Sequence, residues 1–340
     1  MWFYWTLHCN VYIHVLHHHS TLTSCLLFSF ISLICFLLSW SSMSVENVAA
    51  PPPPPPPPPS LARSLSSKKK LYQALAEGRA PVEGDHEEAS VILGQRESSF
   101  RKDLQWLLFN KYVPSLIQDG PQCGLVALWM ATHLLQPPKT VVLETLVQMA
   151  KDNGFTEQGE MFSACDMAKL AEEVCGCRVQ RLSGGMMGEN IAVILKHLTG
   201  GQPVLIPYDE DFNHEPCLRS GHKAHWAVVS GVLLGLRQGC VDSRLFPPDL
   251  TLPWLHLSQN ESPVSWPTDD VKEVFVLAKQ GKSLRYQLWK YELVTQSNSQ
   301  LKEMDPQRAS DGTRYVLPPG GVQDGLAGQV LLLHTNTQKN

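Results

Sequence analysis

A cysteine at the start of an apolar segment is the residue in this sequence best placed to do chemistry. Cys123 follows the Gly120-Pro121 pair, which breaks the chain, and Gly124 leaves room for a substrate backbone near the sulfur. Residues 123–135 are apolar on nearly every face and predict a helix buried inside a domain. A thiol attacks carbonyls only as a thiolate, which a helix N-terminus favours. The pattern predicts a nucleophile, with an inert buried thiol as the alternative.

A thiolate nucleophile needs an imidazole as its general base and acid, and the segment 221–229 (GHKAHWAVV) supplies two. His225 directly abuts a strand that is apolar on both faces, so the sheet would fix its position, whereas His222 lies in the preceding loop. We therefore favour His225, with a hydrogen-bonded core histidine as the alternative. Cysteine at a helix start, followed by histidine at a strand start, is typical of papain-like peptidases.

A third side chain would orient the imidazole, and two residues are candidates. Asp242 follows the His225 strand, about where a neighbouring strand could return it, and Gln280 ends the next strand. We assign the role to Asp242 and keep Gln280 as the alternative.

The elements that must position these residues fall into two groups. Helical periodicity is followed by strand patterns, which predicts an α+β fold with an N-terminal helical part packed on an antiparallel sheet. Helices are predicted at 100–112, 123–135, 140–153, 163–175 and 189–198. Strands are predicted at 203–207, 225–234, 274–278, 284–289, 315–317 and 329–333, with a hairpin around Gly281.

The N-terminal part of the chain differs in kind from the rest. Residues 1–42 contain the uncharged stretch Thr21–Trp40, which is long enough for a membrane anchor but equally fits an upstream extension before a start at Met43. A cleaved signal ranks last, because no Lys or Arg precedes Arg63, and a membrane is not favoured as a partner. Residues 43–97 read as a disordered proline-rich region and linker, and 98–340 as the peptidase domain. The run Pro51–Pro59 predicts polyproline II, either as a spacer or as a ligand for an aromatic groove.

Composition narrows the possible partners. The 340 residues are 43% apolar and 18% charged, enough for a large core, and the net charge of −4 offers no basic surface for nucleic acid. Nine cysteines without a regular framework suggest reduced thiols and hence a cytoplasmic location. No cofactor is predicted.

A structural zinc site is the competing interpretation of the histidine-rich segment. Residues His214, Cys217, His222 and His225 have types and spacings that tetrahedral zinc tolerates. A hydrolytic zinc motif is missing, because His214-Glu-Pro-Cys217 lacks the second histidine of H-E-x-x-H. A non-catalytic adaptor with a degenerate peptidase fold is a further alternative.

Several long strings resemble one known family. The segments 118–130, 159–163, 205–217 and 221–227 are similar to the actin maturation proteases, a papain-like family related to bacteriocin-processing peptidases. The resemblance covers about residue 100 to the C-terminus. It implies an aminopeptidase that removes the acetylated N-terminal Met or Cys of immature actin, with Pro51–Pro59 recruiting profilin-bound actin.

The resemblance also implies a glutamine that holds the oxyanion, and here the sequence departs from the pattern. Papain-like peptidases carry this glutamine at the position of Ile117, one residue before Gln118. We favour Gln118, because the Gly-Pro turn could absorb one residue, and keep Gln122 as the rival. Since actin N-termini are acidic, Arg219 and Lys223 near the His225 strand are candidate substrate contacts, or ordinary surface charges.

Overall fold

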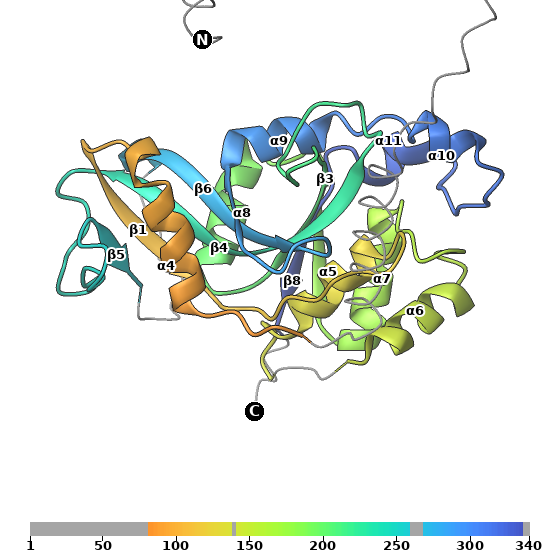
Figure 1. Ribbon diagram of the computed structural model, residues 1–340, viewed down its shortest axis with the longest axis horizontal. Coiled ribbons are helices and arrows are strands. Elements are labelled where there is room, and N and C mark those ends of the chain that lie inside the picture. Colours follow the sequence, from red (N-terminus) through yellow and green to blue (C-terminus); the bar gives the residue numbers. More distant parts are fainter. Residues whose placement is uncertain (1–80, 138–140, 259–267, 336–340) are drawn as a thin grey trace, which may run out of the picture. The chain divides into compact units, whose positions relative to one another are not determined.

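The computed structural model describes residues 81–137, 141–258 and 268–335 (Figure 1). The proline run and the apolar stretch Thr21–Trp40 lie outside these residues. The described helices are α4 (His86–Gln95), η1 (Glu97–Ser99), α5 (Cys123–Thr132), α6 (Leu143–Asp152), α7 (Ala164–Cys175), α8 (Glu189–Thr199), η2 (Thr268–Asp270), α9 (Tyr291–Ser299), α10 (Pro306–Ser310) and α11 (Gly321–Leu326). None of the helices in these residues is long and apolar enough to cross a membrane.

One mostly antiparallel sheet organises the fold. Its strands are β1 (Leu104–Asn110), β2 (Arg178–Leu182), β3 (Val204–Asp209), β4 (Ala224–Arg237), β5 (Leu255–Leu257), β6 (Val271–Gln280), β7 (Gln287–Lys290) and β8 (Val330–His334). The order is β2-β8-β3-β4-β1-β5, with β6 paired to β4 and β7. Only the β1–β5 pairing is parallel among these strands. The predicted α+β class and antiparallel sheet are confirmed.

Strand β4 is the centre of this sheet, as its apolar sequence predicts. Its first half pairs with β3 and its second half with β1, while β6 pairs along both halves. Side chains on one face of β4, such as Trp226 and Val228, join the core cluster under α5, and their neighbours Ala227 and Val229 join the second cluster. In Figure 1, α5, α6 and α7 lie together, away from β1 and β5. The strand therefore presents its first residues to the helical part.

Two predicted elements are wrong. Residues 100–112 were predicted as a helix, but 104–110 form β1, because Leu104, Trp106 and Leu108 face one core cluster while Leu107 and Phe109 face the other. This alternation has the period of a strand, which a short apolar run does not distinguish from a buried helix.

The predicted strand 315–317 is absent, since the structure has no strand between β7 and β8.

A third difference lies in the predicted linker, where residues 86–95 form α4. Asp85 caps this helix by accepting a hydrogen bond from the Glu88 N–H, and Ala89 and Leu93 are fully buried in the core. The ordered domain therefore begins earlier than residue 98.

Candidate active site

Cys123 is the first residue of α5, as the sequence predicts. Every residue from Gly124 to Thr132 is buried, which explains why this helix is apolar on all faces. The role expected for Gly124 is wrong, however. A Cβ there would lie 2.6 Å from Met167 Cε and 2.9 Å from Met161 Cβ. Glycine therefore allows α5 to approach the 161–167 segment closely and is not a space for substrate.

His225 is brought to Cys123 from the second residue of β4. Its ring is 2% exposed and hydrogen-bonds the Cys123 thiol. The pKa of Cys123 is lowered to about 7: burial raises it, but the charge and hydrogen bond of His225, the Trp226 N–H and Lys282 together outweigh burial. The predicted cysteine–histidine pair is thus present as a geometry suited to an ion pair.

Gln280 occupies the position behind the imidazole. His225 Nε2 lies 3.0 Å from Gln280 Oε1, which also accepts the Lys282 N–H at 2.6 Å. Gln280 ends β6 and is fully buried, and its neighbour in register is Ala227 on β4. Because Nε2 donates to Gln280, Nδ1 is the ring nitrogen left for the thiol. Gln280, the alternative candidate for orienting the imidazole, is therefore the residue in contact with His225.

The assignment of Asp242 as this third residue is wrong. Asp242 lies beyond the end of β4 opposite to His225, and its carboxylate accepts the N–H, Nε and an Nη of Arg244 at 2.8 to 3.1 Å. This pairing, mainly its side-chain hydrogen bond, lowers the pKa of Asp242. Strand β4 runs from Ala224 to Arg237, so its length separates Asp242, beyond its last residue, from His225 near its first.

Of the two glutamines before the cysteine, Gln118 lines the cavity that contains Cys123, and Gln122 does not. The Gln118 N–H donates to the Gly281 carbonyl at 2.7 Å, and its Nε2 donates to the Gly120 carbonyl at 2.7 Å. A side-chain amide nitrogen carries two hydrogens, so one remains for a substrate oxygen. Gln122 instead packs against Gly159, where a Cβ would lie 2.6 Å from its Cγ.

A buried carboxylate beside the histidine was missed by the sequence analysis. Glu210 Oε1 lies 3.9 Å from His225 Nδ1, and the same carboxylate pairs with Lys282 and with His214. Glu210 directly follows β3, whose Tyr208 is opposite His225 in register. A charge immediately after a strand that pairs with the histidine strand is the signal that could have identified it.

The loop ahead of His225 is fixed by another buried carboxylate. Asp209 is fully buried and accepts the N–H groups of Arg219, Gly221 and Lys223 at 2.6 to 3.0 Å, together with Gln300 Nε2 at 3.0 Å. Four donors on one carboxylate hold the backbone that leads into β4. The loop therefore delivers His225 in a fixed position.

The predicted zinc cluster is not formed. The residues in the described ranges include no group of three or more His, Cys, Asp or Glu side chains that could hold a metal ion. His214 pairs with Glu210 and His222 with Glu303, while His225 faces Cys123 and Gln280. The four residues are thus divided among different partners.

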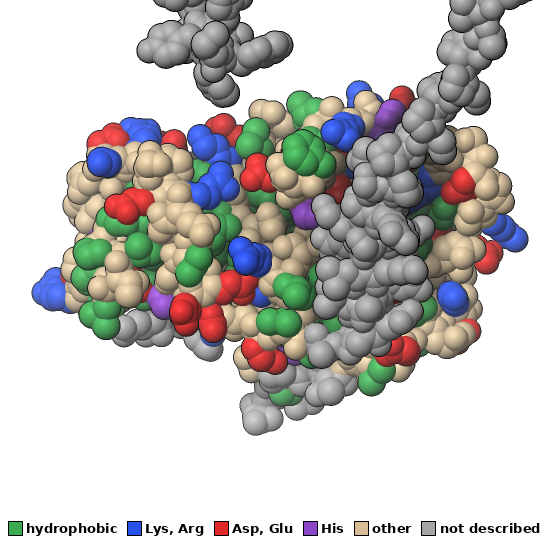
Figure 2. Space-filling model, viewed as in Figure 1, with side chains coloured by type: hydrophobic (Ala, Val, Ile, Leu, Met, Phe, Trp, Pro, Cys, Tyr) green, Lys and Arg blue, Asp and Glu red, His purple; other side chains and the backbone are tan. Residues whose placement is uncertain are grey.

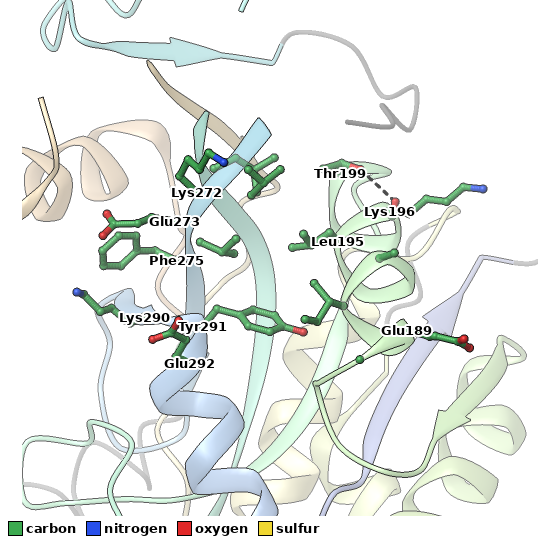
Figure 3. Close-up of a pocket in the computed structure, with 16 residues that line it drawn as sticks. Glu189, Leu195, Lys196, Thr199, Lys272, Glu273, Phe275, Lys290, Tyr291 and Glu292 are labelled. Carbon is green, nitrogen blue, oxygen red and sulfur yellow. Dashed lines mark hydrogen bonds between the residues drawn. The ribbon is translucent and has the colours of Figure 1, made fainter. Parts of the chain in front are cut away.

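The cavity at Cys123 has a volume of about 340 Å³. Its apolar lining comes from Pro121, Met161, Phe162, Ala224, Trp226, Tyr315 and Leu326, and its charged lining from Glu160, Glu210, Lys223, Lys282 and Arg308. A larger cavity of about 720 Å³ lies between α8 and β6, where Leu195 and Tyr291 point into it from facing sides (Figure 3). It shares no lining residue with the Cys123 cavity.

Comparison with known proteins decides the family. Residues 113–233 match the family model described as actin maturation protease-like, C-terminal domain. The actin maturation protease of Danio rerio is 84% identical over 278 residues, which cover 82% of this chain and 91% of the relative. The chain belongs to the actin maturation protease family. The Homo sapiens member is 52% identical over 270 residues, covering 78% of this chain and 76% of the relative.

Membership of this protease family makes the chain a peptidase. A solved structure titled as a putative C39-like peptidase from Bacillus anthracis is also similar. Its TM-score is 0.32 at 13% identity, with 64% of this chain and 90% of that chain covered.

The lowered pKa of Cys123 predicts the pH dependence of this family member. Because that pKa is about 7, the thiolate should be lost as pH falls through 7, leaving about a tenth of it at pH 6. We expect kcat/KM, and the rate at which iodoacetamide alkylates Cys123, to fall together below pH 7. Alkylation with the midpoint of an unperturbed thiol, well above 8, would contradict the ion pair.

Gln280 gives a second prediction. Replacing Gln280 by alanine removes the acceptor at His225 Nε2, so the imidazole should lose its orientation and kcat should fall about 10- to 100-fold. Asp242→Ala is the matched control, since an exposed residue far from the histidine should change kcat less than about twofold. A loss with Asp242→Ala equal to that with Gln280→Ala would reverse the assignment.

Proposed function

We propose that this peptidase is a cysteine aminopeptidase that removes the acetylated N-terminal Met or Cys of actin. The observation that carries the proposal is the Cys123–His225 pair with Gln280 behind it, at one small cavity. The relatives' name, actin maturation protease, supports actin as the substrate.

The cavity is large enough to hold a capped amino acid. Its volume of about 340 Å³ lies at the low end for ligand pockets. Met161, Phe162 and Leu326 give it an apolar wall, which suits the side chain of methionine or cysteine. The site is therefore compatible with an exopeptidase that accepts a capped N-terminus.

The proposed reaction has two halves. The Cys123 thiolate attacks the carbonyl carbon of the first residue, while Gln118 Nε2 and the Cys123 N–H hold the oxyanion. The imidazolium of His225 gives its proton to the departing amine of the second residue, which leaves a thioester on Cys123. His225 then takes a proton from water, which attacks the thioester, releasing the acetylated amino acid and restoring the thiolate.

The proposal has two further parts, a cytoplasmic location and profilin as a second partner. The proline run that would bind profilin lies outside the described residues. A cytoplasmic enzyme would keep its thiol reduced, and Pro51–Pro59 would serve as a polyproline ligand for profilin bound to actin. Acidic and basic side chains are mixed over the face of the described residues that Figure 2 shows.

Purified wild-type protein tests the proposal with three synthetic peptides. One begins with acetyl-Met, one begins with acetyl-Cys, and one carries the same sequence with Met in its interior. Mass spectrometry should show free acetyl-Met or acetyl-Cys and a peptide one residue shorter from the first two, and no cleavage of the third. Cleavage at the interior methionine, or no cleavage of either acetylated peptide, would contradict an aminopeptidase.

A further inference from the structure

The Cys123 cavity contains a cation that lacks a carboxylate partner among the described residues. Its Lys and Arg side chains are Lys223, Lys282 and Arg308. Lys223 Nζ is 2.9 Å from Asp305 Oδ2, and Lys282 pairs with Glu210. Arg308 forms no salt bridge with any carboxylate in the part of the chain that the structure describes. Among the described residues, the half-buried guanidinium of Arg308 is therefore the cation of this cavity that is left to pair with a ligand.

Two aromatic rings hold Arg308 in place. Its Cζ lies 5.8 Å from the centre of the Phe162 ring and 5.5 Å from that of Tyr315, and the two rings are nearly perpendicular. Two hydrogen bonds hold the Tyr315 ring in position. The Tyr315 hydroxyl donates to Asp311 Oδ2, and the backbone N–H of the following residue, Val316, donates to Glu160. A guanidinium packed on rings keeps its N–H edge for a planar, bidentate acceptor such as a carboxylate.

The acidic groups that share the cavity already have donors. Glu160 accepts the Thr156 hydroxyl and three backbone N–H groups, those of Glu157, Gln158 and Val316. Glu210 is paired with Lys282 and His214. Asp305 accepts a hydrogen bond from Lys223, and Asp311 accepts from the Thr313 N–H and the Tyr315 hydroxyl. These hydrogen bonds lower the pKa of both carboxyl groups, and the charge of Arg308 lowers it less. These carboxylates of the described residues are therefore engaged elsewhere, which fits a carboxylate supplied to Arg308 by the substrate.

We propose that Arg308 binds a carboxylate side chain of the substrate and makes this site prefer acidic N-terminal sequences. The inference rests on the proposed aminopeptidase function. Because the removed Met or Cys has no acidic side chain, the carboxylate belongs to one of the first residues that remain after cleavage. Arg308 thus distinguishes substrates by the charge beside the scissile bond.

Peptides of the form acetyl-Met followed by Asp-Asp, Asn-Asn or Lys-Lys test this inference by their relative kcat/KM. Wild type should prefer Asp-Asp over Asn-Asn by about tenfold or more, the size of one hydrogen-bonded charge pair. Arg308→Gln should bring that ratio to about 1, Arg308→Lys should leave it intermediate, and Arg308→Glu should favour Lys-Lys. Arg314→Gln, an exposed arginine outside this cavity, is the matched control and should keep the wild-type ratio.

The Asn-Asn rate, measured on the same preparation, is the reference that separates lost recognition from lost folding. A wild-type ratio retained in Arg308→Gln, or no preference in wild type, would overturn the role of Arg308 while leaving the aminopeptidase intact. If wild type releases no acetyl-Met from any of the three peptides, the proposed function itself is wrong and this inference falls with it.

Discussion

Actin that keeps its acetylated N-terminal residue is the result we expect when Cys123→Ala replaces the wild-type protein in cells that lack the endogenous activity. Alanine has no nucleophile, so the first half of the reaction cannot begin, and the rate should fall on the order of 10⁴-fold or more. Mass spectrometry of the actin N-terminus reads the outcome. The substitution should leave folding intact, because the thiol is a partly buried small side chain at a helix start.

Cys165→Ala is the matched control for this experiment. Cys165 is an exposed, free cysteine near the start of α7 and does not line the cavity. Cells that carry this variant should process actin as wild type does. Normal processing by Cys123→Ala would show that another group attacks the peptide bond.

The second large effect is expected at Gln118. Removing one oxyanion donor costs about 10²- to 10³-fold in kcat in comparable hydrolases, because the donor acts on charge that develops only in the transition state. Gln118→Ala should therefore lower kcat by that factor and change KM little. The measurement is steady-state kinetics with the acetyl-Met peptide, at a pH where Cys123 is ionised.

Gln122→Ala is the natural comparison, because Gln122 is the rival and lies outside the cavity lining. It should lower kcat much less than Gln118→Ala. If Gln122→Ala causes the larger loss, the donor is the glutamine adjacent to the cysteine. Alkylation of Cys123 by iodoacetamide in each variant checks that the thiol remains reactive.

The parts of the site that could be predicted are those that carry a strong local signal. Cys123 stands between a Gly-Pro break and a fully apolar helix, and His225 opens the most apolar strand, so both elements and their order are visible in the sequence. Their meeting depends on β4 lying in the middle of the sheet, which its two apolar faces already indicated.

The parts that could not be predicted depend on pairing between distant strands. Choosing Gln280 over Asp242 requires the register of β6 on β4, which places Gln280 opposite Ala227. Glu210 and Lys282 come together from the ends of different strands, so neither segment alone reveals the pair. The strand β1 was mistaken for a helix because its short apolar run fits both periods.

A covalent intermediate on Cys123 is the most direct test of the central claim. Wild-type protein mixed with the acetyl-Met peptide and quenched in acid within milliseconds can be digested and examined by mass spectrometry. The peptide that contains Cys123 should carry the mass of an acetylmethionyl group as a thioester, formed and lost at rates compatible with turnover. Two results would contradict nucleophilic attack by Cys123. One is turnover with this group attached to another residue. The other is turnover in which neither wild type nor His225→Ala carries a thioester on Cys123.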